Sequence, residues 1–84
     1  MTDAEKIQFL NKAVTVLHEN IYVACFECRF DSEELDIENY NSQEFMSLFP
    51  DYLSPSAYMA RTTIDASMKK LIAIKNKLDE LNNA

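Results

Sequence analysis

The sequence predicts an all-α protein, built as a long antiparallel helical hairpin with a short third helix in its connection. Residues 3–30 and 55–82 carry apolar side chains at alternating spacings of three and four, which is typical of helices that pack along one stripe. Helix-capping residues precede both segments. The chain has no glycine, which disfavours tight β-hairpins, and its 84 residues are few enough for a single domain, 1–84.

The first helix is predicted over residues 3–30. Thr2 and Glu5 match a capping box, in which each side chain accepts a hydrogen bond from a backbone N–H that lacks a helical partner. The principal stripe comprises Ile7, Leu10, Val14, Leu17, Ile21, Ala24 and Cys28. Near the end of the helix, more apolar side chains lie off the stripe than one partner helix can cover, namely Tyr22, Val23, Phe26 and Phe30.

The last helix is predicted over residues 55–82. Ser54 suits the N-cap, and Pro55 suits the first helical position, where its missing N–H costs no hydrogen bond. The stripe of this helix comprises Ala57, Ala60, Ile64, Ser67, Leu71, Ile74, Leu78 and Leu81. At 1.5 Å per residue both helices are roughly 40 Å long, so we expect them to pack side by side.

The connection divides into an acidic part, residues 31–41, and a short helix with an apolar arm, residues 42–54. Asn41 followed by Glu44 predicts the cap of this short helix. The apolar side chains of the arm are Phe45, Met46, Leu48, Phe49, Tyr52 and Leu53. We expect the arm to cover the apolar end of the first helix and to enclose Phe26.

A second apolar row remains uncovered on the first helix. Phe9 and Val16 lie seven residues apart, and Val23 and Phe30 continue the row. The arm is too short to reach Phe9, and exposed apolar patches of this size usually mark an interface. We therefore expect a homodimer in the form of a four-helix bundle, with an interface of Phe9, Ala13, Val16, Met68 and Ile72.

Charge is distributed unevenly along the chain, whose formal net charge is −6. Residues 31–54 contain seven acidic and no basic residues. Such a run is either a solvated connection or a surface that attracts positive charge. The second interpretation predicts a partner-binding site composed of Glu33, Glu34, Asp36, Glu38, Tyr40, Phe49 and Tyr52. Residues 34–38 also alternate polar and apolar side chains, which allows a short extended edge.

Cys25 and Cys28 match a C-x-x-C pattern, and His18 lies two helical turns earlier. A zinc site usually has four ligands, and the chain holds no other Cys or His. A redox pair usually lies at a helix N-terminus, whereas this helix has already run for over twenty residues. We therefore expect two core cysteines with free thiols, no metal or cofactor, and no enzymatic activity.

Nucleic acid and membrane are both disfavoured as partners. The lysines of the last helix have no aromatic residue among them, and the pairs Asp65–Lys69 and Lys75–Asp79 neutralise part of their charge. The longest apolar run, residues 21–26, is far shorter than the roughly 20 residues that a membrane span needs. The beginning of the chain does not resemble a secretory signal. We expect a cytoplasmic protein.

These features predict a small acidic protein-binding module, an inhibitor or antagonist that docks on a basic surface of a larger protein. The alternative is a structural homo-oligomeric bundle, an assembly or scaffold component with no separate ligand. In size, acidity and helical content the chain is similar to small phage- or plasmid-borne inhibitors and to bacteriocin immunity proteins. That similarity rests on no motif, so it implies the same class of function and no particular partner.

Overall fold

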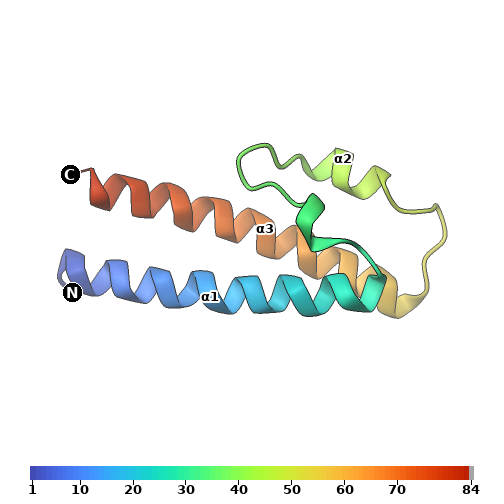
Figure 1. Ribbon diagram of the computed structural model, residues 1–84, viewed down its shortest axis with the longest axis horizontal. Helices are drawn as coiled ribbons and strands as arrows, with labels where there is room; N and C mark the ends of the chain where they lie inside the picture. The colour runs from blue at the N-terminus through green and yellow to red at the C-terminus, as the bar shows by residue number, and fades with distance from the viewer. Residues whose placement is uncertain (84) are drawn as a thin grey trace.

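The computed structural model describes residues 1–83, and its two long helices lie side by side and antiparallel (Figure 1). The order of elements is α1 (Asp3–Cys28), the 3-10 turn η1 (Ser32–Glu34), α2 (Ser42–Ser47) and α3 (Pro55–Asn82). The molecule is elongated, measuring 47 × 20 × 18 Å. Residues 1–83 contain no strand, so the prediction of an all-α hairpin with a short helix between its long helices is confirmed.

Side-chain caps define where the helices begin. The Thr2 hydroxyl accepts a hydrogen bond from the Glu5 N–H at 3.2 Å, and the Glu5 carboxylate accepts one from the Thr2 N–H at 3.3 Å. At the start of α3, the Ser54 hydroxyl accepts a bond from the Ala57 N–H at 3.3 Å. These bonds satisfy backbone donors that have no partner within the helix, which is why both helices begin where the capping residues stand.

The first helix ends at Cys28, two residues earlier than the expected residue 30. Arg29 takes the left-handed conformation with φ 58°, a position that glycine usually occupies. The Phe30 N–H then bonds to the Cys25 carbonyl at 2.9 Å, which closes the helix and turns the chain. Phe30 is consequently directed toward α2, and its ring contacts that of Phe45 at 5.3 Å between centroids.

The core lies in the half of the hairpin where the connection adds a third layer. Ile64 is the most deeply buried side chain, with none of its surface exposed. The other buried apolar residues are Ile21, Ala24, Cys25, Phe45, Ala60, Met68 and Leu71. At the other end of the hairpin, Ile7 and Leu81 remain only half-buried, because just two helices meet there. The stripes predicted from spacing therefore do face each other, but their burial is uneven.

The connection covers one flank of the hairpin and leaves the other flank bare (Figure 1). Leu35 and Ile37 pack against the core from this covered flank, and Phe49 stacks on Phe30 at 5.6 Å. The expectation that the arm encloses Phe26 is wrong, since the Phe26 side chain is 81% exposed. The arm packs instead on Phe30, which follows the end of α1 and contacts Phe45 and Phe49, whereas the Phe26 side chain faces solvent.

Replacing Ile64 by Val should lower the free energy of unfolding by about 1 kcal/mol, because a methylene is lost from a site without solvent contact. Replacing Phe26 by Ala removes a far larger side chain, yet should change stability by less than about 0.5 kcal/mol because the ring is exposed. Urea denaturation of both variants measures the difference. A larger loss for Phe26→Ala than for Ile64→Val would contradict the described packing.

Candidate protein-binding surfaces

Local hydrogen bonds hold the acidic connection in shape. The Asp31 carboxylate accepts a bond from the Glu33 N–H at 3.0 Å and so caps η1. The Asp36 carboxylate accepts bonds from the Asn39 side chain at 2.8 Å and from the Glu38 N–H at 3.0 Å. The Asn39 bond, followed by the Glu38 bond, lowers the pKa of Asp36 from its ordinary value. Asp36 is therefore a fixed, ionised carboxylate at neutral pH.

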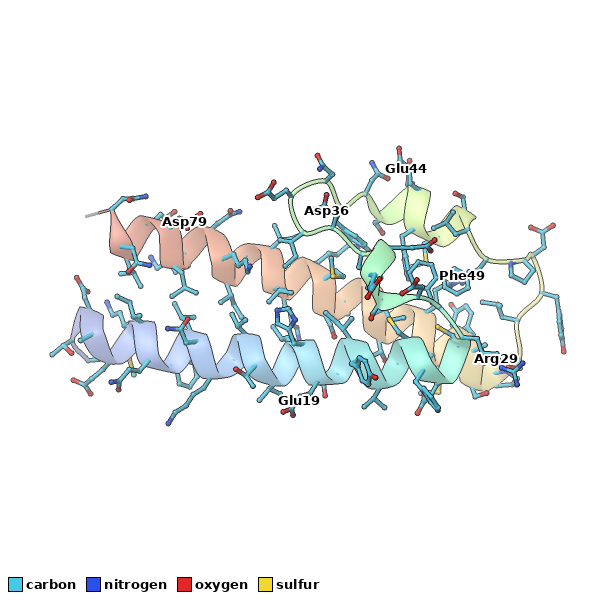
Figure 2. All side chains as sticks on the ribbon, viewed as in Figure 1. Glu19, Arg29, Asp36, Glu44, Phe49 and Asp79 are labelled. Carbon is cyan, nitrogen blue, oxygen red and sulfur yellow. The ribbon has the colours of Figure 1, made fainter. Side chains whose placement is uncertain are left out.

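An open groove runs between this connection and the second half of α3. Its apolar floor consists of Leu35, Ile37, Ile72 and Leu78. Its charged rim consists of Glu33, Asp36, Glu38 and Asp79, with Lys75 as the one cation among its lining residues. Figure 2 shows Asp36 over α3 and Asp79 farther along the same helix. The groove thus combines an apolar floor with a predominantly negative rim.

A buried carboxylate attaches the connection to α3. Asp65 is only 8% exposed, and it accepts hydrogen bonds from the Tyr40 hydroxyl and from the Ser42 hydroxyl, the latter at 2.7 Å. Lys69 lies one turn farther along α3, with its ammonium 3.0 Å from Asp65, as expected for this i, i+4 pair. Asp65 therefore joins the start of α2 to the middle of the long helix.

The electrostatics of this cluster favour an ionised Asp65. Burial alone would raise the pKa of the Asp65 carboxyl, but the hydrogen bonds from Tyr40, Ser42 and Lys69 outweigh it and hold the pKa below its ordinary value of 3.8. Burial, and then the bond to Asp65, raises the pKa of Tyr40. The tyrosine consequently is a protonated donor at neutral pH, where Asp65 is charged.

The structure divides the predicted partner-binding residues into two groups. Glu33, Glu34, Asp36 and Glu38 are all exposed on the connection. The aromatic members are placed differently. Tyr40 donates its hydroxyl to Asp65, and Phe49 is half-buried among Phe30 and Phe45. Tyr52 is 84% exposed, but it belongs to the loop between α2 and α3. Glu33, Asp36 and Glu38 therefore line the groove, whereas Glu34 lines a separate pocket with Tyr40.

The apolar floor of the groove was not predicted, although the sequence contains a signal for it. Residues 34–38 alternate polar and apolar, but the expected extended edge does not form, because Glu34 ends η1 and Glu38 lies in a turn. Leu35 and Ile37 are half-buried against the hairpin, whereas Asp36 and Glu38 between and beyond them are exposed. The alternation does not indicate which surface Leu35 and Ile37 face. In the structure that surface is α3, with Ile72 and Leu78.

The second candidate surface is the bare flank of the hairpin. Phe9, Val16 and Val23 of α1 are 64%, 54% and 56% exposed. Beside them on α3 lies Met59, which shares a hollow with Val23. Large apolar side chains in a row of this length are unusual on a surface that meets only water.

The predicted dimer interface is divided between the two flanks. Phe9 and Val16 lie on the bare flank, and Ala13 beside them is half-buried. Met68 was expected to be exposed, but this is wrong: it is 2% exposed and lies near Leu35 of the connection. Ile72 is half-buried in the floor of the acidic groove. Both α3 residues belong to the covered flank because the connection folds over their side of the helix.

The cysteines have free thiols, as expected. Cys25 is buried and Cys28 half-buried. Burial, followed by the neighbouring Cys28 and Asp31, raises the pKa of Cys25 to about 11, so its thiol is protonated at neutral pH. His18, the other residue of the considered zinc pattern, is exposed. Within residues 1–83, no three His, Cys, Asp or Glu side chains are grouped closely enough to hold a metal ion.

Comparison of the chain with protein-family models, with curated proteins and with solved structures found no match. In the part of the chain that the structure describes, none of the helices combines the length and apolar character that a membrane crossing requires. Any assignment of function therefore depends on the two surfaces described above.

Replacing Tyr40 by Phe should lower the free energy of unfolding at pH 7 by about 1.5 kcal/mol, because a hydrogen bond to a charged acceptor is lost. Urea denaturation measures this loss.

Replacing Asp65 by Asn should also lower the free energy of unfolding, and this loss should depend on pH. A carboxyl whose folded pKa lies below the unfolded one contributes its stability above the unfolded pKa and loses it as pH falls through the folded pKa.

The deficit of Asp65→Asn relative to the unmodified chain should therefore be full at pH 7 and should shrink below about pH 4. Urea denaturation at several pH values measures this deficit. Asp51→Asn, which removes an exposed carboxylate from the same connection, is the matched control. A deficit that stays constant down to pH 3 would show that the contribution of Asp65 to stability does not depend on its charge.

Proposed function

We propose that this chain is a protein-binding module that docks through its acidic connection on a basic surface of a larger protein. The observation that carries the proposal is the groove beside the connection. Four carboxylates, those of Glu33, Asp36, Glu38 and Asp79, surround an apolar floor, and Lys75 alone opposes them. A surface of this composition suits a partner segment that presents lysine or arginine beside apolar side chains.

The two components of the groove would contribute differently to binding. The carboxylates attract a positive partner from a distance and orient it, and this contribution weakens as salt rises. The floor adds the favourable burial of apolar area, which depends little on salt. Occupying a basic surface excludes any other ligand from it, which supports the role of an inhibitor or antagonist. The free thiols support a reducing compartment such as the cytoplasm.

The double variant Glu33→Gln, Glu38→Gln tests this function with a synthetic amphipathic helix of lysine and leucine as the probe. Two lost ion pairs of about 0.5 kcal/mol each should weaken binding about fivefold and should reduce its salt dependence. Glu19→Gln, Asp51→Asn changes net charge equally away from the groove and should bind like the unmodified chain. Titration calorimetry at two salt concentrations measures both. Equal weakening by the two double variants would leave only a non-specific charge effect and would reject the site.

A second candidate function, a homodimeric four-helix bundle that serves as a structural component, is supported by a separate observation. The apolar row Phe9, Val16 and Val23 is more than half exposed, and Val23 borders a hollow that only residues of α1 and α3 line. Burying this row against a second copy would supply the third and fourth helices that the open half of the hairpin lacks. The acidic groove is on the other flank, so the two functions are compatible.

Val16→Glu should convert the dimer to a monomer, because it would bury two unpaired carboxylates at the centre of the interface. Thr15→Glu introduces the same charge at an exposed neighbouring position off the row and should leave the dimer intact. Multi-angle light scattering over a range of concentrations measures the mass. A monomer at every concentration for the unmodified chain would reject this function.

A further inference from the structure

We propose that two copies of this chain pair through their bare flanks with their ends reversed, about a two-fold axis that passes beside Val16 and Ala66. This inference rests on the second candidate function and specifies its geometry. It is carried by three features of the flank, namely the spacing of its apolar residues, their register across the hairpin, and the two charges at its ends.

The spacing is the same on both helices. On α1 the row Phe9, Val16 and Val23 repeats every seven residues. On α3 the row Met59, Ala66 and Ala73 repeats in the same way, and all three residues are exposed. Positions seven apart lie on nearly the same face of a helix, so each row is a continuous strip along the flank.

The register of the two rows follows from the hollow that Val23 and Met59 share. Because the helices are antiparallel, seven steps back along α1 and seven steps forward along α3 advance equally along the hairpin. Val16 is therefore level with Ala66, and Phe9 with Ala73. The flank has three levels, and the middle level is Val16 with Ala66.

This flank is complementary to itself. Phe9 and Val23 lie equally far from Val16, about 10.5 Å along the helix, and Met59 and Ala73 lie equally far from Ala66. When a second copy is laid on the flank with its ends reversed, Val16 meets Val16 and Phe9 meets Val23. Met59, the larger α3 side chain, then meets the small Ala73. The α1 row thus packs against the α1 row of the second copy, and the α3 row against the α3 row. The two Met59 side chains do not meet each other.

Charge selects the reversed arrangement over one with aligned ends. Lys6 and Glu27 border the apolar row at opposite ends of α1, ten and eleven residues from Val16. End reversal brings Lys6 of each copy beside Glu27 of the other, so two ion pairs form. Aligned ends would instead gather Lys6 and Lys77 of both copies at one end of the bundle. Within one copy, Lys6 lies only 3.9 Å from Asp3 in an exposed pair, which constrains it little.

The bare flank extends along a molecule that is 47 Å long. A stable pair would bury about 800 Å² on each partner. Since the connections cover the opposite flanks, they would lie on the two outer faces of the bundle. The dimer would then present two acidic grooves at once, which would increase avidity for a partner with repeated basic sites.

Cysteine cross-linking tests the arrangement. Val16→Cys and Ala66→Cys are placed separately in a Cys28→Ala background, where the remaining Cys25 is 2% exposed. In the reversed dimer each variant faces its own copy, so each should form a disulfide-linked dimer with itself on mild oxidation. A mixture of the two variants should give little of the mixed disulfide. With aligned ends, Val16 would face Ala66 and the mixed disulfide would dominate.

A dominant mixed disulfide overturns the reversed geometry while leaving self-association, and with it the second candidate function, intact. Absence of every disulfide together with a monomeric mass in light scattering overturns both. Neither result affects the acidic groove, which the peptide titration tests on the other flank. The parental Cys28→Ala chain, oxidised in parallel, reports any linkage through Cys25.

Charge reversal gives an independent test in soluble, uncross-linked protein. Lys6→Glu and Glu27→Lys should each weaken dimerisation about fivefold, because two ion pairs become two repulsions. The double variant should return to within about twofold of the unmodified chain. Lys12→Glu, on an exposed position of α1 off the row, should have no effect. Analytical ultracentrifugation measures the dissociation constants, and a double variant no better than the singles would overturn the Lys6–Glu27 pairing.

Discussion

The buried carboxylate of Asp65 is the interaction on which the arrangement of the connection depends. It receives the hydroxyls of Tyr40 and Ser42 from the connection and the ammonium of Lys69 from its own helix. A charged group this deep in the protein would be costly without such partners. With them it draws the start of α2 onto α3, and the connection between η1 and α2 is held against the same flank. Together with the packing of Leu35, Ile37 and Phe45 on the core, that attachment makes one flank different from the other.

The consequence is a molecule with two unlike flanks. On the covered flank the connection completes a core around Ile64 and supplies the carboxylates of the groove. On the bare flank the apolar side chains Phe9, Val16 and Val23 of α1 are each more than half exposed. A helical hairpin of 84 residues buries little apolar area in its open half, where two helices meet alone. The surface that remains is therefore suited to association, through charge on one side and through apolar contact on the other.

The chain forms its turns without glycine. Arg29 takes the left-handed conformation that ends α1, at an energetic cost that the Phe30–Cys25 backbone bond and the aromatic contacts of Phe30 offset. Asparagine and aspartate side chains shape the connection by accepting backbone N–H bonds at Asp31, Asp36 and Asn41. Side-chain acceptors thus help to form the turns of the connection, and two of its carboxylates, those of Asp31 and Asp36, are held in defined positions.

The sequence by itself determined the helices, because spacing and capping are local: Thr2, Asn41 and Ser54 cap the three α-helices, and the two stripes face each other. It also located the acidic run. Only the tertiary structure decided which flank the connection covers, since that choice depends on contacts between residues 23 and 25 positions apart, Ser42 and Tyr40 with Asp65. No periodicity encodes such a contact. For this reason Phe26 was expected inside and is exposed, while Met68 was expected outside and is buried.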